Sequence, residues 1–166
     1  MSLRTDASDA LSTVCKRAAL LHNDGSIQFI DGSDCCNLDI SLDYFVVIEH
    51  RNHLIVMSDI PLPVINGEIT YDFRNRNSYQ GSLAIGVGQK QISRGVFVMF
   101  AGNGDQQGAA QDAIDINSND LRAWIIDDGL NSSYFLTDFD LSGDVNVQDK
   151  ALFLLNNGLF SEVDRE

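Results

Sequence analysis

The sequence predicts a mainly β protein with a small α part, in which an antiparallel β-sandwich precedes two loop-helix repeats. Between Ala18 and Phe100, short β-branched and aromatic runs alternate with turn residues, as is typical of antiparallel strands. After Phe100, a polar loop rich in Gly, Asn, Asp and Gln is followed by a short apolar helix, and this unit occurs twice. The hydrophobic fraction of 44% is sufficient for a packed core.

We expect three segments: a polar lead-in (1–17), a β-sandwich domain (18–101) and a tandem loop-helix module (102–166). No apolar run reaches the roughly 18 residues of a membrane span, so we expect no membrane-spanning segment. No signal peptide opens the sequence, and we interpret the chain as a piece of a longer secreted or cell-surface protein.

The expected strands follow from period-two alternation and from the turns between them. They are Ser26–Ile30, Tyr44–Glu49, His53–Met57, Glu68–Phe73, Leu83–Val87 and Gly95–Phe100. Asn66-Gly67 is a strong hairpin signal, because both residues tolerate positive φ. Pro61 and Pro63 are expected between strands, where a missing N–H does no harm.

The two predicted helices align without gaps, Asp120–Leu130 on Asp149–Leu159. Each has an aromatic residue, Trp124 or Phe153, followed by two aliphatic residues. Each also reaches a Gly-Leu pair, whose glycine is placed to end the helix in the left-handed conformation. Neither helix can bury its apolar face alone, so we expect them to pack as a pair and against the sheet.

Charge excludes one class of partner and favours another. The formal net charge is −13, with 24 acidic against 11 basic residues. Nucleic acid is therefore not an expected partner, because its phosphates require Lys and Arg. Acidity often serves only solubility. Here, however, Asp residues crowd at short regular spacings into segment 103–149, which favours neutralisation by bound cations.

The loop before the second helix has the spacing of a calcium site. Oxygen-bearing side chains occupy loop positions 1, 3, 5, 9 and 12, with Gly143 at position 6 for the bend and Val145 at position 8 as an anchor. The expected ligands are Asp138, Asp140, Ser142, the carbonyl of Asp144, Asn146 and Asp149. Asp rather than Glu at position 12 departs from the EF-hand. The alternative is an Asx-rich turn that leads into a helix N-cap.

The first loop is a second, less regular candidate. Its expected ligands are Asn103, Asp105, Gln107 and Asp120. We align Ile114 with Val145, which places four extra residues after Gly108 and two more before the helix. Asp112 and Asp115 are substitute ligands on the inserted segment. The alternative is a loop that keeps only a structural role.

The pattern Asp138-x-Asp140-x-Ser142-Gly143-x-Val145-Asn146-x-x-Asp149, followed by a short apolar helix and repeated once, resembles the type I dockerin repeat, a half EF-hand unit. Stretches Tyr44–Ser58 and Gly95–Gly102 are similar to C-terminal regions of secreted or surface proteins of Bacteroidetes-type bacteria, some of them haemagglutinin-like. The resemblance implies calcium as the cofactor, the ligands named above and a secreted or cell-surface location.

We therefore interpret the chain as a non-catalytic, calcium-binding C-terminal module. One alternative is protein attachment, in which the duplicated helices bind a cohesin-like or other surface protein. Another is a carbohydrate-binding or adhesin module, with the glycan on the sandwich or on loop Arg74–Tyr79. An enzyme is least favoured: its candidates are His50 and His53 with Glu49 or Asp43, and such residues more often satisfy a tight turn.

The three cysteines leave two interpretations open. Cys15 can pair with Cys35 or Cys36 in an oxidising compartment, which leaves one thiol over. Buried free thiols are the alternative.

Overall fold

The computed structural model describes residues 1–22, 26–30, 37–74, 78–81, 86–105 and 114–165. The strands are β1 (Ser2–Arg4), β2 (Thr13–Lys16), β3 (Ala19–Leu21), β4 (Ile27–Phe29), β5 (Asp43–Ile48), β6 (Val56–Met57), β7 (Leu62–Pro63), β8 (Lys90–Ser93) and β9 (Val96–Val98). The helices are a 3-10 turn at Ala10–Ser12, α1 (Ser118–Asp127) and α2 (Val147–Asn156). Strand pairings within the described residues are antiparallel, so the predicted mainly β class with a small α part is confirmed.

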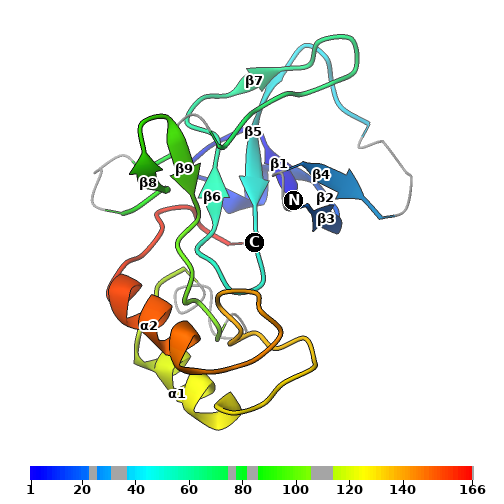
Figure 1. The fold of residues 1–166 in the computed structure, drawn as a ribbon. Coiled ribbons are helices and arrows are strands. Elements are labelled where there is room, and N and C mark those ends of the chain that lie inside the picture. The colour runs from blue at the N-terminus through cyan, green and yellow to red at the C-terminus, as the bar shows by residue number, and fades with distance from the viewer. Residues whose placement is uncertain (23–25, 31–36, 75–77, 82–85, 106–113, 166) are drawn as a thin grey trace.

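Strand β5 lies at the centre of the β part. The main sheet has the order β2-β1-β5-β6, and β7 also pairs with β5, while β3-β4 and β8-β9 form separate two-stranded sheets. Figure 1 shows these two hairpins on either side of β5, with both helices beyond one end of the sheet. Tyr44, Val46, Val47 and Ile48 of β5 are all buried, because the strand is covered on both faces. This accounts for its continuous β-branched and aromatic run.

Strands β1 and β2 lie inside the segment 1–17, which the sequence marks as a polar lead-in, and were not expected. Leu3 is buried and pairs with Val46 and Cys15. Arg4 is also buried, and its guanidinium donates to Thr13 Oγ1 and to the Asp164 carbonyl. A strand whose buried polar residue is satisfied from the far end of the chain has no alternating hydrophobic pattern to reveal it.

Other local expectations had mixed outcomes. Asn66 and Gly67 form the expected turn, with φ of 55° and 83°, and the flanking Ile65 and Glu68 pair with each other. The regular strand expected at Glu68–Phe73 is absent from the described elements. Pro63 was expected outside the strands. It lies in β7 at the sheet edge, where it pairs with Asp43 of β5. The strand expected at Leu83–Val87 lies mostly outside the described residues.

Both helices begin two residues earlier than the sequence alignment suggests, because Asn117 and Asn146 cap them. Their glycines end them as expected, with φ of 85° at Gly129 and 88° at Gly158. No helix in the described part of the chain is long and apolar enough to cross a membrane.

The helix pair and the strands share a core. Trp124 and Phe153 of the two helices pack with Leu54 and Ala101 from the β part and with Val145 of the second loop. The expected packing of the helices on each other is therefore confirmed, while their contacts with the β part in this cluster are made by residues that flank the strands.

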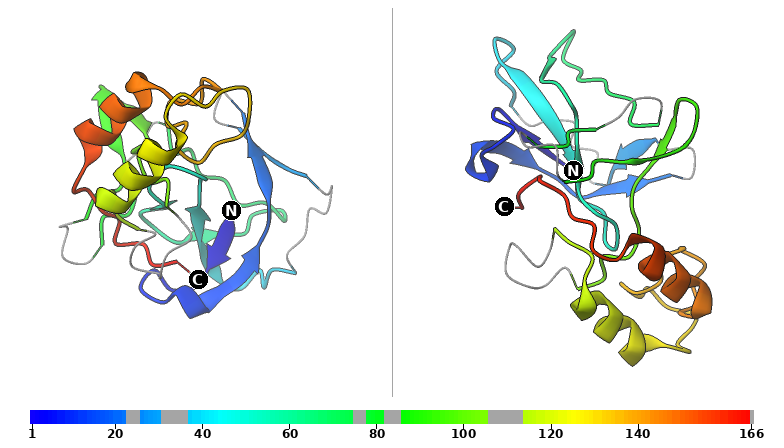
Figure 2. Two further views of the ribbon diagram at one scale, coloured as in Figure 1. Left: turned by 90° about the horizontal axis from the view of Figure 1, so that it is seen from below. Right: turned by 90° about the vertical axis from the view of Figure 1, so that its left-hand side faces the viewer.

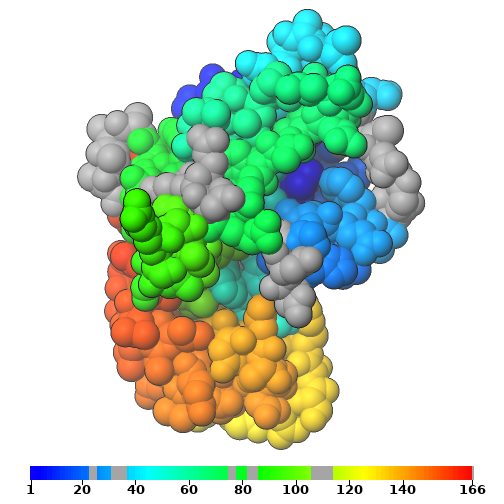
Figure 3. Space-filling view, turned by 45° about the horizontal axis from the view of Figure 1, so that its top comes forward, coloured from blue at the N-terminus to red at the C-terminus, as the bar shows by residue number. Residues whose placement is uncertain are grey.

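The chain after α2 returns to the sheet, as Figures 1 and 2 show. The Phe160 carbonyl accepts from Val87 N at 2.8 Å, and Ser161 Oγ donates to the Ile55 carbonyl at 3.0 Å. Val163 is fully buried beside Val47 and Ile55. The last described segment is thus part of the β core rather than an extension of the helices, although Figure 3 shows the repeats as a distinct end of the molecule.

We expect Phe153→Ala to lower the free energy of unfolding by about 3–5 kcal/mol, since it leaves a cavity between the helices and the β part. Leu155→Ala on the same helix is the control; this side chain is 72% exposed, and its removal should change stability by less than about 0.5 kcal/mol. Urea denaturation measures both. Similar losses in the two variants would contradict the shared core.

Candidate metal centre

Each helix starts with a reciprocal capping arrangement that turns a carboxylate back over its loop. Asn146 Oδ1 accepts from Gln148 N at 2.8 Å, and Asp149 accepts from Asn146 N at 2.8 Å. Asn117 and Asp120 repeat this pattern at α1. Asp and Asn are strong N-cap residues, so this geometry fits both the calcium interpretation and the simple N-cap alternative.

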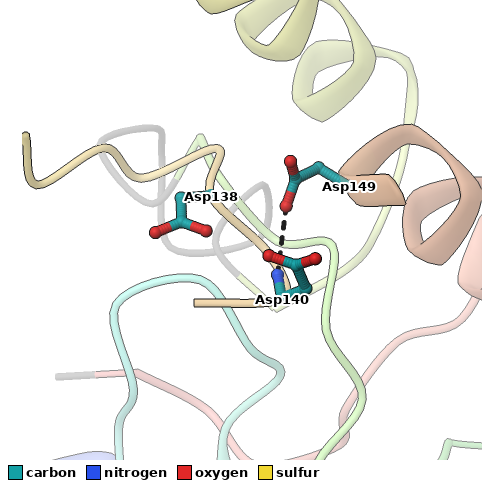
Figure 4. Close-up of side chains that lie close together, drawn as sticks. All are labelled: Asp138, Asp140 and Asp149. Atoms are coloured by element: carbon teal, nitrogen blue, oxygen red, sulfur yellow. Dashed lines mark hydrogen bonds between the residues drawn. The ribbon is translucent and has the colours of Figure 1, made fainter. Parts of the chain in front are cut away.

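The second loop gathers three carboxylates beside the start of α2. Asp138, Asp140 and Asp149 each offer an oxygen, and these oxygens lie within 4.8 Å of one another. Asp138 and Asp149 are buried, whereas Asp140 is exposed. Figure 4 shows the three side chains close together, with Asp140 N donating to Asp149 Oδ1 at 3.1 Å. Among the described residues, these three form the one group of three or more His, Cys, Asp or Glu side chains placed so that they could hold a metal ion.

Backbone amides of the loop hold the first aspartate in place. Ser142 N donates to Asp138 Oδ1 at 2.9 Å, and Gly143 N donates to Asp138 Oδ2 at 3.1 Å. Gly143 has φ of 92°, the left-handed conformation that its predicted bend requires. The loop therefore wraps around the Asp138 carboxylate.

The remaining predicted ligands meet at one carbonyl. Ser142 Oγ donates to the Asp144 carbonyl at 3.2 Å, and Asn146 Nδ2 donates to the same oxygen at 3.4 Å. The structure thus brings Ser142, Asp144 and Asn146 together at the open side of the loop.

The donor set fits a hard divalent cation. Calcium binds oxygens at roughly 2.3–2.6 Å, so ligands on opposite sides of the ion lie about 4.6–5.2 Å apart. The three carboxylate oxygens lie within 4.8 Å of one another, so one ion can reach all three. Each carboxylate has about four lone-pair sites, so oxygens that already accept backbone amides keep the capacity to bind a cation.

One arginine offsets part of the charge. Arg51 Nη2 lies 3.5 Å from Asp138 Oδ2, and its guanidinium stacks on the Tyr134 ring at 3.6 Å from the centroid. The neighbouring Asn52 donates through Nδ2 to the Asp138 carbonyl. The β5–β6 turn is therefore attached to the loop. No local sequence pattern indicates this contact, because Asn52 and Asp138 are 86 positions apart.

The two repeats pair reciprocally through their backbones. Ile116 N donates to the Leu159 carbonyl and Val145 N to the Leu130 carbonyl, both at 2.8 Å. Ile116 is therefore the counterpart of Val145, and the predicted alignment of Ile114 with Val145 is wrong. The extra residues of the first loop therefore all precede Asp115. The backbone hydrogen bonds show this alignment, whereas the aliphatic side chain of Ile114 suggested a different one.

At the positions equivalent to Asp138, Asp140 and Asp149, the first loop has two carboxylates, Asp105 and Asp120, and Asn103 takes the place of the third. Asp120 Oδ1 accepts from Gly104 N at 2.6 Å and from Asp105 N at 3.1 Å, matching the role of Asp149. Burial, together with the nearby Asp105 carboxylate, raises the pKa of Asp120 to about 7. Asn103 is fully buried at the position of Asp138. Of the other candidates, Gln107 and Asp112 lie outside the described residues.

Asp115, the other substitute ligand, makes a local contact, accepting from Asn117 Nδ2 at 2.8 Å.

Cys15 is disulfide-bonded, which favours the first of the two cysteine interpretations, while Cys35 and Cys36 lie outside the described residues.

His50 and His53 form an edge-to-face pair with ring centroids 4.6 Å apart. His53 Nδ1 lies 2.8 Å from Asn52 Oδ1, and burial lowers the pKa of His53 to about 3. Glu49, one of the two carboxylates proposed to serve them beside Asp43, pairs with Lys16 at 3.2 Å and with Arg165 at 3.5 Å. The histidines thus support the turn next to the loop.

Comparison of the chain with protein-family models, with curated proteins and with solved structures finds no match. Any function must therefore be argued from the loops, the turn and the cavities of this chain.

We expect acid to destabilise the protein partly through His53. Its pKa is about 3 in the folded state against about 6.5 when unfolded, so the unfolded state binds more protons between these values. The stability contribution is complete above about pH 6.5 and is lost as pH falls toward 3, by at most about 1.4 kcal/mol per pH unit. In His53→Gln, urea titrations from pH 6.5 to 4 should show a shallower loss. Identical slopes would contradict this assignment.

Proposed function

We propose that the chain is a non-catalytic calcium-binding module whose second loop holds one calcium ion. The observation that carries the proposal is the convergence of the Asp138, Asp140 and Asp149 oxygens within 4.8 Å. The residues that would hold the ion are Asp138, Asp140, Ser142, the carbonyl of Asp144, Asn146 and Asp149. An all-oxygen set favours calcium over zinc, which prefers nitrogen and sulfur ligands.

The ion would stabilise the folded state. It would neutralise carboxylates that repel one another, and it binds only where the loop is formed. Because Asp138 also contacts Arg51 and Asn52, a restrained loop would hold the helix pair against the β5–β6 turn.

The first loop would play a mainly structural part. It keeps the capping carboxylate Asp120 and the reciprocal backbone pairing, but Asn103 stands where the second loop has a buried aspartate. We therefore propose one ion rather than two.

Cellular context is part of the same proposal. The disulfide bond of Cys15 supports an oxidising environment, in line with a secreted or cell-surface location. The β-sandwich remains a prediction, supported by one five-stranded antiparallel sheet and two hairpins. The dockerin-like character of the repeats is supported by their ligand spacing and pairing.

Calcium added to chelator-treated protein should give a one-site binding isotherm by calorimetry and a rise in melting temperature. At a free calcium concentration 100 times Kd, the gain in stability should be about 2.7 kcal/mol. No heat and no thermal shift at millimolar calcium would overturn the proposal.

Asp140→Asn should weaken calcium binding by about tenfold or more, because it removes a charged ligand. Asp140 suits this test because it is exposed, so the metal-free fold should tolerate the change. Asp128→Asn, the same charge change at an exposed position after α1, should leave the affinity unaltered. Equal affinities of the two variants would exclude the second loop.

A second candidate function is attachment to a partner protein through the helices. Ile125 and Ile126 of α1 are 61% and 70% exposed, and Leu154 and Leu155 of α2 are 60% and 72% exposed. These pairs occupy equivalent positions in the two repeats, which supports an interaction surface formed by both helices.

Titration with a type I cohesin domain tests this candidate. We expect calcium-dependent binding that is lost in the Ile126→Ser, Leu155→Ser double variant, while calorimetric calcium binding is retained. A cohesin that fails to bind the calcium-loaded protein would exclude this form of attachment.

The glycan-binding alternative has less support. Arg74 pairs with Asp72 at 2.9 Å, and Tyr79 donates its amide to the Met57 carbonyl and packs on the core. Residues 75–77 of the loop lie outside the described residues. A glycan array would test this alternative directly.

A further inference from the structure

A cavity of about 430 Å³ lies beside the β5–β6 turn, and none of the three clustered carboxylates is among its described lining residues. Its walls are mainly apolar and include Ile48, Phe73, Val98 and Met99. One wall is Leu141, which occupies position 4 of the second loop. Ligand sites typically occupy roughly 300–1,000 Å³ and combine apolar walls with a few polar groups, so the cavity is at the small end of this range.

The polar side chains at the described lining are His22, His50, His53, Arg74 and Gln89. His53 is neutral at pH 7, since burial lowers its pKa to about 3. Gln89 Nε2 donates to the Phe73 carbonyl at 3.0 Å, whereas Gln89 Oε1 is buried with no hydrogen-bond partner among the described residues and so offers an acceptor at the lining. Arg74 at the lining is paired with the Asp72 carboxylate, which offsets its charge. Carboxylates are absent from the described lining residues.

The mainly apolar lining favours a ligand with a large carbon surface. A compact apolar ring with one N–H or O–H group would bury that surface and donate its one hydrogen bond to Gln89 Oε1.

We propose that this cavity binds a small, uncharged, largely apolar molecule carrying one hydrogen-bond donor, and that calcium in the second loop strengthens this binding. The calcium dependence rests on the proposed function. Leu141 forms part of both loop and cavity, and Asn52 bonds both the Asp138 carbonyl and His53. An ion that restrains the loop would therefore restrain the cavity wall, and by linkage the two ligands strengthen each other.

Indole is the probe, since it is a compact aromatic with one N–H donor. In amide NMR spectra of the full chain, increasing indole should shift the signals of Val98, Met99 and His53 in a saturable way. Glucose at the same concentrations should leave them unchanged. Absence of saturable shifts with indole, with or without calcium, would overturn the proposal.

Val98→Asp places a charge at the cavity wall and should weaken indole binding at least tenfold. Val98 is 36% exposed, so the fold should tolerate the change, and Val96→Asp at a second lining position replaces it if Val98→Asp unfolds. Ile92→Asp is the matched control, since Ile92 is exposed on the same hairpin but does not line the cavity. Equal losses in Val98→Asp and Ile92→Asp would overturn the proposed location.

The calcium arm repeats the titration with chelator and with saturating calcium, beside calorimetric calcium binding on the same sample. A several-fold tighter indole Kd in calcium supports the coupling. Calcium that binds without changing the indole Kd would overturn the coupling alone. A protein that binds no calcium would overturn the proposed function and the coupling, whereas saturable indole binding in chelator would still support the cavity.

Discussion

Asp138 joins the second loop to the β5–β6 turn through both its side chain and its backbone. Its carboxylate accepts two loop amides and pairs with Arg51, while its carbonyl accepts from Asn52. A buried carboxylate is costly unless it is hydrogen-bonded and neutralised. The β5–β6 turn therefore stabilises the loop, because Arg51 offsets part of the charge of the buried Asp138 carboxylate. The loop in turn stabilises the polar turn, because the Asp138 carbonyl accepts the hydrogen bond of Asn52. The proposed cation and the proposed cavity both depend on this contact.

The reciprocal pairing of the repeats explains why the first loop is still useful, although it has fewer carboxylates at the ligand positions. Ile116 and Val145 each exchange backbone hydrogen bonds with the chain that follows the other repeat's helix. Trp124 and Phe153 then close the core between them. The second loop is thus shaped partly by the first. A first repeat without an ion would still be required to present the carboxylates of the second.

The sequence predicted what local spacing determines. The duplicated helices, their terminal glycines and the gathering of Asp138, Asp140 and Asp149 all follow from residues close together in the chain. It did not predict what distant partners determine. The sequence does not reveal strand β1, because its buried Arg4 depends on a hydrogen bond to the distant Asp164 carbonyl. The alignment of the first loop depends on the hydrogen bond from Ile116 N to the Leu159 carbonyl. The roles of Arg51 and Asn52 were missed for the same reason.

The return of the chain after α2 has a mechanical consequence. Segment 100–103 enters the repeats along Asn52 and Leu54, and segment 159–164 leaves them along Val87 and Ile55. A pulling force on the helices would therefore be shared between two routes that reach the β part side by side. Tearing the repeats away would require both to rupture together, which gives this junction more resistance to tension than a single flexible linker would provide.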